Sequence, residues 1–127
     1  MKKLPDAEFD IMKAIWQMTP PVTAGMIQER LTRDTGKTCT LQTLHTLLGR
    51  LVDRGFLSFE KARKDKLFRP LVTRDAYLQV ETQSFIKQYH EGSLLQLVSA
   101  AYQGESLSEA DIGELIEWVD ALRGKPS

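Results

Sequence analysis

Residues 40–55, which read T-L-Q-T-L-H-T-L-L-G-R-L-V-D-R-G, decide the fold. Thr40 can cap the start of a helix here, because its hydroxyl can accept a hydrogen bond from an unpaired amide of the first turn. Gly55 can end that helix, since glycine enters the left-handed conformation without a Cβ clash. Between them the apolar residues recur at helical spacing and should gather on one face, which holds Leu41, Leu44, Leu47, Leu48, Leu51 and Val52.

The opposite face of this helix carries short hydrogen-bonding side chains and one long cation. Its residues are Gln42, Thr43, His45, Thr46, Gly49, Arg50 and Asp53. Short polar side chains can approach base edges closely, and an arginine can reach a guanine edge or a phosphate. We therefore interpret this face as a DNA-reading surface that uses Gln42, Thr43, His45, Thr46 and Arg50. The alternative is the solvated side of an ordinary amphipathic helix.

Two further helices are expected ahead of this one. The first covers residues 6–18, where an apolar stripe consists of Phe9, Ile11, Met12, Ile15 and Trp16. It ends at Pro20 and Pro21, because proline lacks an amide donor and disfavours a helical residue before it. The second is capped by Thr23, runs to about residue 34 and should bury Met26, Ile27 and Leu31. A turn that contains Gly36 joins this second helix to the helix at 40–55, whose outer face is polar. Two short helices arranged in this way describe a helix-turn-helix.

After Gly55 the apolar spacing changes from helical to alternating, which is typical of strands. Residues 57–61 and 67–72 are expected to form a hairpin, and residues 63–66 to form a basic turn between its strands. A basic hairpin after a helix-turn-helix predicts a winged helix, whose wing lies on the DNA backbone. The wing residues expected to contact DNA are Lys61, Arg63, Lys64 and Lys66. The alternative is a tip that is charged only because loops often are.

The rest of the chain reads as three helices, at 75–91, at 94–102 and from Ser108 onward. Ser108 and Asp111 are spaced as a capped acidic first turn. So short a set of helices cannot easily bury its apolar residues alone. We therefore predict that a second copy covers them, with a dimer surface formed by Tyr77, Leu78, Phe85, Tyr89, Leu94, Val98, Ile112, Leu115, Ile116 and Val119. The alternative is that this half folds back onto the first.

The charge of the chain is unevenly divided. Its 127 residues have no net charge, but residues 1–73 hold 13 Lys and Arg against 8 Asp and Glu, whereas residues 74–127 hold 4 against 9. A basic first half suits a polyanion, and an acidic second half would repel one. We therefore expect a DNA-binding domain at 1–73 and a dimerisation domain at 74–127, with residues 124–127 as a loose tail.

Other sequence features favour a cytoplasmic, non-enzymatic protein. Cys39 is the single cysteine, no apolar run is long enough to span a membrane, and Lys2 and Lys3 precede no signal-peptide core. Catalytic triads, paired metal-binding histidines and glycine-rich phosphate loops are not found, so we expect neither a cofactor nor a metal. Cys39 is interpreted as a small buried thiol, with a redox or metal switch as the alternative, and His90 as a favourable group at a helix end.

Four stretches, taken together, carry a resemblance that covers nearly the whole chain. They are D-A-E-F-D-I-M-K-A-I-W at 6–16, T-L-H-T-L-L-G-R-L-V-D-R-G at 43–55, S-F-I-K-Q-Y-H-E-G-S-L at 84–94 and L-S-E-A-D-I-G-E-L at 107–115. The chain resembles the BlaI/MecI/CopY family of bacterial repressors, typified by the penicillinase repressors. The resemblance implies a winged-helix domain, a helical dimerisation domain and binding of a dimer to inverted-repeat operators. It places Thr43, Thr46 and Arg50, with His45 between them, on the family's recognition helix.

The chain departs from the family pattern at three places. Pro5 stands where the family often has a capping serine that pairs with the following glutamate, here Glu8, so we expect Asp6 to cap the first helix instead. The wing, where the family often has Gly-Arg and then Tyr, has Arg63, Lys64 and Phe68 and should turn differently. Penicillinase repressors are cleaved at an Asn-Phe bond. The corresponding pair here is Ala100 and Ala101, so the cleavage specificity does not carry over.

The sequence thus predicts a mainly α protein, with a winged helix-turn-helix domain that has a small two-stranded wing, followed by a three-helix dimerisation domain. Its predicted function is a dimeric transcriptional repressor that binds pseudo-palindromic double-stranded operator DNA through residues 40–54 and 61–66. An inducing signal would release it, with proteolysis by a sensor-linked protease as one route. The alternatives are a winged helix used as a protein-interaction module and a repressor released by a small ligand in the dimer interface.

Overall fold

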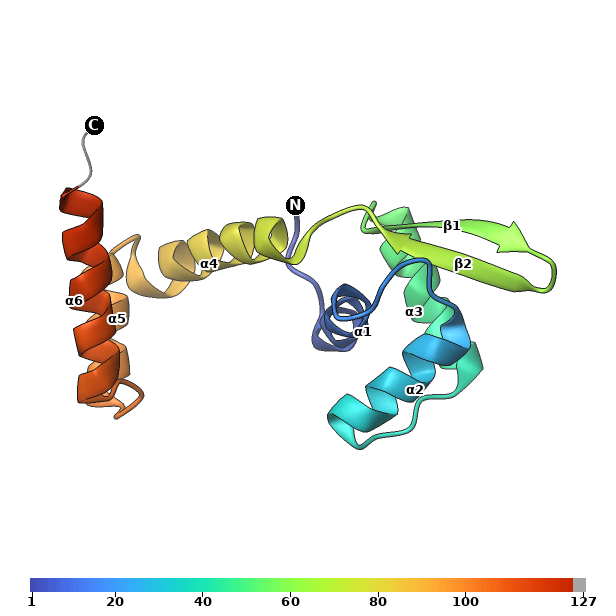
Figure 1. The fold of residues 1–127 in the computed structure, drawn as a ribbon, viewed down its shortest axis with the longest axis horizontal. Helices are drawn as coiled ribbons and strands as arrows, with labels where there is room; N and C mark the ends of the chain where they lie inside the picture. Colours follow the sequence, from blue (N-terminus) through green and yellow to red (C-terminus); the bar gives the residue numbers. More distant parts are fainter. Residues whose placement is uncertain (125–127) are drawn as a thin grey trace. The chain divides into compact units, whose positions relative to one another are not determined.

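A computed structural model of the chain describes residues 1–124, which form six helices and one two-stranded hairpin (Figure 1). This confirms the predicted mainly helical class with a small wing. The elements in order are α1 (Asp6–Trp16), α2 (Ala24–Thr35), α3 (Leu41–Asp53), β1 (Leu57–Ala62), β2 (Asp65–Pro70), α4 (Arg74–His90), α5 (Leu94–Gln103) and α6 (Glu109–Arg123). Most of the expected loose tail, residues 125–127, lies outside the described part.

The chain divides by its internal contacts into two units, Met1–Glu81 and Thr82–Ser127, and α4 contributes to both. The predicted domain boundary, after residue 73, falls just before α4 begins. The first turns of α4 nevertheless belong to the first unit, because Tyr77 is buried in its core. The functional division between DNA binding and dimerisation therefore stays a prediction.

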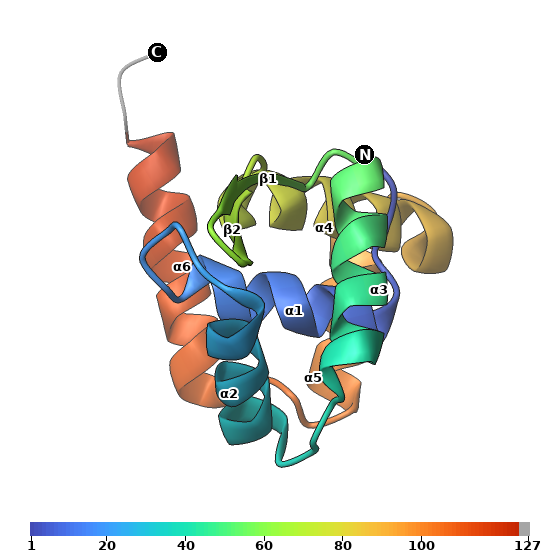
Figure 2. The ribbon, with the colours of Figure 1, turned by 90° about the vertical axis from the view of Figure 1, so that its right-hand side faces the viewer.

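The first unit is a winged helix-turn-helix. Figure 2 shows α1 crossing between α2 and α3, with the hairpin packed alongside. The core is filled by large side chains that are almost fully buried, among them Ile11, Met12, Ile15, Ile27, Leu44, Leu48, Leu51, Leu57 and Phe68. Each such side chain stabilises the fold by about 1.5–3 kcal/mol relative to exposure. This shared core fixes the position of α3 in the unit.

The predicted apolar faces are mostly confirmed, but two of their members are not buried. Met26 is 44% exposed and Leu41 is 47% exposed. Each lies in the first turn of its helix, beyond the packed face, whereas Ile27 and Leu44 one position or one turn further on are fully buried. Helical spacing alone does not show where a packed face ends.

The helix ends are set by short-range hydrogen bonds. The hydroxyls of Thr23 and Thr40 accept bonds from the amides of Met26 and Thr43, at 3.2 Å and 3.1 Å, which confirms both predicted caps. The prediction that Asp6 caps α1 is wrong. Asp6 is the first residue of α1, and the preceding Pro5, which has no side-chain acceptor, occupies the cap position.

The hairpin is a regular antiparallel pair in which Ala62 faces Asp65. Its turn therefore contains only Arg63 and Lys64, and the predicted turn over residues 63–66 is too long, because Asp65 and Lys66 already pair in β2. Val22 anchors the base of the hairpin through two backbone hydrogen bonds with Phe68, at 3.0 Å and 2.8 Å. The wing is thus joined directly to the helical core.

Tyr77 closes the core of the first unit from the start of α4. Its side chain is 3% exposed and its hydroxyl accepts a 2.8 Å hydrogen bond from the amide of Leu4. Its ring lies 5.7–5.9 Å, between centroids, from the rings of Phe9, Trp16 and Phe56. Such aromatic contacts fix the beginning of α4 against α1 and against Phe56, which follows α3.

The second unit consists of the remainder of α4, α5 and α6. Ser93 caps α5, and Ser108 and Asp111 form the predicted capping box at the start of α6. The Ser108 amide, which donates to the Asp111 carboxylate at 2.9 Å, and the Ser108 hydroxyl hold the pKa of that carboxyl below its usual value. Within the part of this unit that the structure describes, no hydrophobic side chain is fully buried.

Candidate nucleic-acid interface

The exposed face of α3 presents two hydroxyls in different hydrogen-bonding states. Thr40 donates a 3.0 Å hydrogen bond to the hydroxyl of Thr43, whose own hydrogen therefore remains able to donate outward. Thr46 donates to the carbonyl of Gln42 at 3.1 Å, so its oxygen remains able to accept. The face can thus offer both a donor and an acceptor to base edges.

The two edges of this face differ in their surroundings. Thr43 and Arg50 are seven residues apart and therefore lie on the same side of α3, two turns from one another. His45 and Gly49 lie on the other side, next to the hairpin, where both line a groove together with Lys66. The helix therefore has one edge beside the wing and one edge away from it.

The hairpin also has two chemically distinct faces. Lys61 pairs with Lys66 and Phe59 with Phe68, so all four side chains lie on the inner face, which continues the core outward. The outer face carries Glu60 opposite Leu67, next to Arg69, which approaches Glu60 at 4.0 Å. The inner face is therefore the one with unpaired cations.

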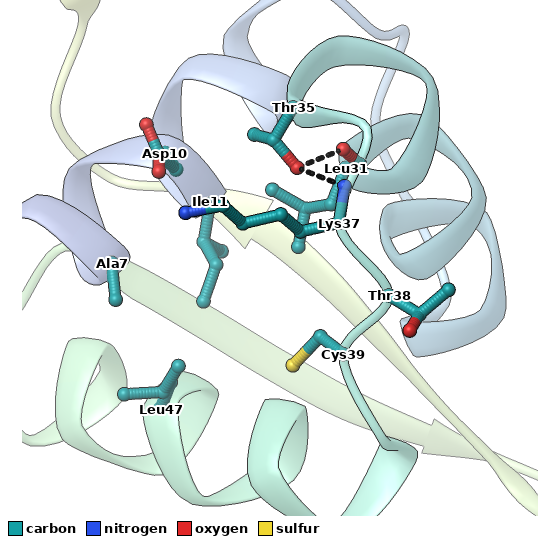
Figure 3. Close-up of a pocket in the computed structure, with 9 residues that line it drawn as sticks. All are labelled: Ala7, Asp10, Ile11, Leu31, Thr35, Lys37, Thr38, Cys39 and Leu47. Carbon is teal, nitrogen blue, oxygen red and sulfur yellow. Dashed lines mark hydrogen bonds between the residues drawn. The ribbon is translucent and has the colours of Figure 1, made fainter.

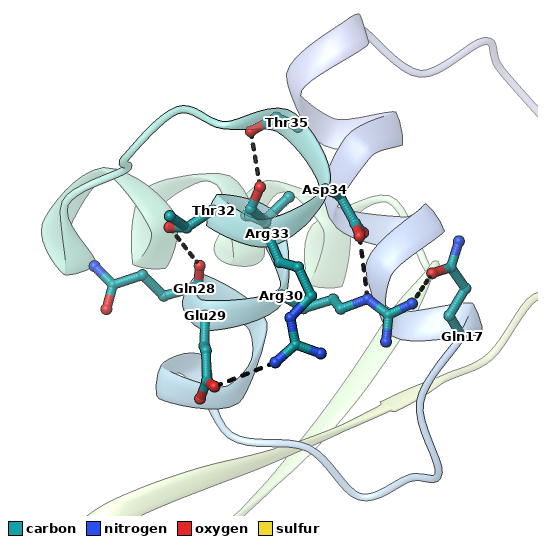
Figure 4. A network of polar contacts seen from close by, with 9 residues as sticks. Gln17, Gln28, Glu29, Arg30, Thr32, Arg33, Asp34 and Thr35 are labelled. Carbon is teal, nitrogen blue, oxygen red and sulfur yellow. Dashed lines mark hydrogen bonds and ion pairs between the residues drawn. The ribbon is translucent and has the colours of Figure 1, made fainter.

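The predicted DNA-contacting cations have no carboxylate partner. In the described residues, none of the charged groups of Arg50, Lys61, Arg63, Lys64 and Lys66 lies within 4.0 Å of a carboxylate oxygen. The arginines of α2 differ, as Figure 4 shows. Arg30 bonds both Asp34 and Gln17, and Arg33 lies 3.6 Å from Glu29. Five cations without a carboxylate partner thus lie on α3 and the wing. Other described cations that also have none include Lys13, Lys37, Arg74, Lys87 and Arg123.

The wing tip holds a cation in a strained conformation. Arg63 has a φ of 60°, in the left-handed region that favours glycine. Lys64 follows it, and both side chains are exposed. Arg63 thus places a long cation at the tip of the wing, in a conformation that Glu91 and Glu105 also adopt elsewhere in the chain.

Sequence reasoning missed the contact that joins the end of α3 to α1. Arg54, the residue after α3, donates from Nη1 to Oε1 of Glu8 at 2.7 Å. The side chain of Glu8 is 1% exposed, so this pair lies at the edge of the core. A glutamate within an apolar helix and a distant arginine are the only sequence signals for it, and neither names its partner.

The family to which the chain belongs follows from comparison with known proteins. A family model described as Penicillinase repressor matches residues 4–121. The chain belongs to the penicillinase repressor family. This confirms the resemblance seen in the sequence, and the family is one of transcriptional repressors, not of enzymes.

Two curated members of the penicillinase repressor family align with most of the chain. The penicillinase repressor of Bacillus licheniformis is 31% identical over 128 residues, which cover 98% of each chain. The methicillin resistance regulatory protein MecI of Staphylococcus aureus strain N315 is 28% identical over 113 residues, which cover 89% of each chain.

Solved structures of related repressors cover smaller shares of the chain. The solution structure of the DNA-binding domain of the repressor BlaI is 26% identical, with a TM-score of 0.49, and covers 61% of this chain and 94% of that domain. The monomeric form of Bacillus licheniformis BlaI in complex with the blaP half-operator is 24% identical, with a TM-score of 0.48. It covers 60% of this chain and 89% of that one.

Cys39 lines a pocket beside the start of α3. The pocket, of about 320 Å³, has an apolar floor that includes Ile11 and Leu47, and Asp10 and Lys37 stand at its rim (Figure 3). Cys39 is half-buried there. The predicted buried thiol is therefore covered only in part, because one side of Cys39 packs against the core and the other lines the pocket. Among residues 1–124, no three His, Cys, Asp or Glu side chains are grouped so that they could hold a metal ion.

The residues predicted to form a dimer surface fall into two groups. Tyr77 and Leu78 pack into or against the core of the first unit. The others remain at least partly exposed. Phe85 and Tyr89 stack at 4.9 Å between ring centroids and are 41% and 59% exposed. The remaining members with their exposed fractions are Leu94 (61%), Leu115 (39%), Ile116 (56%) and Val119 (43%), with Val98 and Ile112 half-buried.

The predicted cleavage position lies inside a helix. Ala100 and Ala101 are in the last part of α5, where their carbonyls accept hydrogen bonds from Gly104 and Ser106 at 3.0 Å and 2.8 Å. A protease needs an extended substrate, so the end of α5 would have to unwind before this bond could be cut.

Across the described helices, none combines the length and apolar character needed to cross a membrane.

Proposed function

We propose that the chain is a transcriptional repressor that binds pseudo-palindromic operator DNA as a dimer. The observation that carries this proposal is the distribution of unpaired cations. Arg50 on α3 and the lysines of the inner wing face have no acidic partner, whereas the arginines of α2 and of the outer wing face do. Unpaired cations beside a helix that presents donors and acceptors suit a duplex, which offers phosphates next to base edges.

The proposed division of labour follows from side-chain geometry. Thr43, Thr46, Arg50, Gln42 and His45 lie on the helix that enters the major groove, where they read bases or anchor phosphates. Arg50 is long enough to reach a guanine edge. Lys61, Arg63, Lys64 and Lys66 bind the flanking backbone, as unpaired exposed cations in a wing do.

Dimerisation is supported by the surface that the second unit leaves uncovered. Leu115, Ile116 and Val119 lie at spacings of one, three and four along α6 and form one exposed apolar face. Helices with no fully buried hydrophobic side chain lack a core of their own, so a second copy is the proposed cover. The dimer surface therefore comprises Phe85, Tyr89, Leu94, Val98, Ile112, Leu115, Ile116 and Val119, without the two residues that belong to the first unit.

Release by an inducing signal completes the proposed function. Its relatives are named a penicillinase repressor and a methicillin resistance regulatory protein, and such names suit a repressor that leaves its operator when a signal arrives. One route is proteolysis in the second unit by a sensor-linked protease, with the bond between Ala100 and Ala101 as the candidate position. Removal of α6 from the dimer surface would weaken dimerisation and, with it, operator binding.

A fluorescence-anisotropy titration tests the proposed function. The full chain is titrated against the DNA upstream of its own gene and against a shuffled fragment, each at several salt concentrations. Preference for the native fragment by about a thousandfold or more would support an operator-specific repressor. Equal affinity for both fragments would contradict specificity for this site. No binding at low salt would instead favour a winged helix that binds another protein through its basic face.

A further inference from the structure

A narrow groove separates the recognition helix from the wing. Its volume is about 160 Å³, and its walls come from α3 and from the inner face of the hairpin. Leu48 and Phe68, both fully buried, form the floor. The rim is polar, with His45 and Lys66 as nitrogen-bearing groups. The full lining is His45, Leu48, Gly49, Val52, Asp53, Phe59, Lys66 and Phe68.

Gly49 forms part of the α3 wall, in the interior of the helix. A glycine there costs about 1 kcal/mol of stability relative to alanine. A Cβ built at this position would meet no atom within 4 Å, so nothing inside the protein requires a glycine. The missing side chain leaves this part of the groove open to solvent.

Lys66 is held at the opposite wall by aromatic packing. Its ammonium nitrogen lies 4.6 Å from the centroid of the Phe59 ring, as in a cation–π contact. The ring centroids of Phe59 and Phe68 lie 6.0 Å apart, and the backbone of Phe68 is hydrogen-bonded to the backbone of Val22 in the core. This chain of contacts orients the cation from the core outward.

We propose that the groove seats one sugar–phosphate unit of the operator backbone. The phosphate lies between the imidazole of His45 and the ammonium of Lys66, and the deoxyribose lies against Gly49 and the edge of Phe59. An apolar floor with a polar rim that carries the ammonium of Lys66 suits such an amphipathic unit, because its sugar is largely apolar and its phosphate anionic. The inference rests on the proposed DNA-binding function and adds to it a specific backbone site.

The direction of the groove places the phosphate at one end. Asp53 also lines it, and its carboxylate would repel an anion. His45 and Asp53 are eight residues apart in α3, which corresponds to about 12 Å along the helix axis. The phosphate therefore occupies the end at His45, away from Asp53.

The test compares Gly49→Ala with Gly113→Ala in the full chain. Gly113 lies inside α6, and a Cβ there also meets nothing within 4 Å, so the two changes are matched. Both should raise the melting temperature, because alanine favours the helix. Only Gly49→Ala should weaken DNA binding, by about tenfold, as expected from the loss of one charge-assisted contact. Operator and shuffled DNA should lose affinity alike, because the site contacts no base.

A second variant examines the same site from the wing. Lys66→Met keeps an unbranched side chain over Phe59 but removes the charge, and it should lower the slope of log affinity against log salt by about 0.9. The double variant with Gly49→Ala should lose little beyond either single change, because both disturb one contact.

The outcomes separate the groove from the wider function. If the wild-type chain binds DNA, and Gly49→Ala and Lys66→Met keep its affinity and salt slope, only the backbone site is overturned. Independent, additive losses in the double variant would overturn it as well. If the wild-type chain fails to bind DNA at low salt, the proposed function and this site fall together.

Discussion

Arg54 and Glu8 form a 2.7 Å ion pair between residues that are 46 positions apart in the chain. Glu8 belongs to the first turn of α1, and Arg54 directly follows α3. The Glu8 carboxylate is almost fully buried, whereas the Arg54 side chain is 43% exposed. The pair therefore ties the end of the recognition helix to the helix that packs behind it.

Arg54→Ala should destabilise the chain by about 1–3 kcal/mol, because it leaves a buried carboxylate without its charged partner. Arg33→Ala is the matched control. It removes an arginine whose pair with Glu29 is exposed on both sides, at 67% and 77%, and should cost about 0.5 kcal/mol or less. Urea unfolding at a fixed protomer concentration measures both. Equal losses for the two variants would show that the buried pair has no special part in holding α3.

Arg50→Ala should weaken binding to the operator by about 1–3 kcal/mol and binding to shuffled DNA by less, because a base contact is lost. Arg123→Ala removes the same charge from the last turn of α6 and should leave both affinities unchanged. Anisotropy titrations of the two variants provide the comparison. An unchanged operator affinity for Arg50→Ala would remove this residue from the interface.

Arg63→Gly should affect stability and binding in opposite directions. Glycine relieves the left-handed conformation at φ 60°, which stabilises the turn by about 1 kcal/mol. The same change should lower the affinity for all DNA and reduce the salt slope by about 0.9, because one phosphate contact is lost. Arg69→Ala, on the outer face near Glu60, is the control and should keep the wild-type slope. The same slope in both variants would exclude the tip from the backbone contact.

Ile116→Asp should disrupt the dimer, because it places a charge on the exposed apolar face of α6, where Ile116 is 56% exposed in the single chain. Glu117→Gln changes the neighbouring position, which points to the polar side of the helix. Sedimentation equilibrium should give a monomer for the first and a dimer for the second. A dimeric Ile116→Asp chain would mean that another surface joins the two copies.

Tyr77→Phe should destabilise the chain by about 1–3 kcal/mol, because the buried amide of Leu4 loses its acceptor. It should also change the response to alkali. Burial raises the pKa of the Tyr77 hydroxyl above its ordinary value of 10.0, so the folded chain keeps this proton to higher pH than the unfolded chain. The associated stability is complete below about pH 10 and is lost as the pH rises through the raised pKa.

Unfolding free energies measured between pH 8 and pH 11.5 test this response. The wild-type chain should lose stability at the alkaline end more steeply than Tyr77→Phe. Tyr102→Phe, at a position 60% exposed, is the control and should retain the wild-type profile. Identical profiles for all three chains would show that ionisation of Tyr77 does not contribute.

The local features of the fold were predictable because neighbouring residues determine them. Thr23, Thr40 and Ser108 each cap a helix through the amide three positions further on, so their residue types and spacing are sufficient. The winged-helix order followed from the change of apolar period after Gly55. These signals need no knowledge of the tertiary structure.

The contacts between distant residues were not predictable in the same way. The ion pair of Glu8 with Arg54 and the hydrogen bond of Leu4 with Tyr77 form only when the helices pack together. Tyr77 was therefore assigned to the dimer surface from its helical spacing, while the structure places it in the first core. The hairpin register similarly decided which wing cations share a face with α3. Candidate DNA-binding residues could be named from the sequence, but their division between two edges and two faces required the fold.

Hydroxyl-radical footprinting of the full chain on its bound upstream fragment tests the central claim most directly, because it maps the backbone that each protomer covers. A dimer with one α3 in each of two major grooves should protect two tracts. Their centres should be about 10–10.5 base pairs apart, or a multiple of that spacing. Ile116→Asp should reduce occupancy of both tracts together. A single protected tract, or weak protection spread evenly along the fragment, would contradict a dimeric, operator-specific repressor.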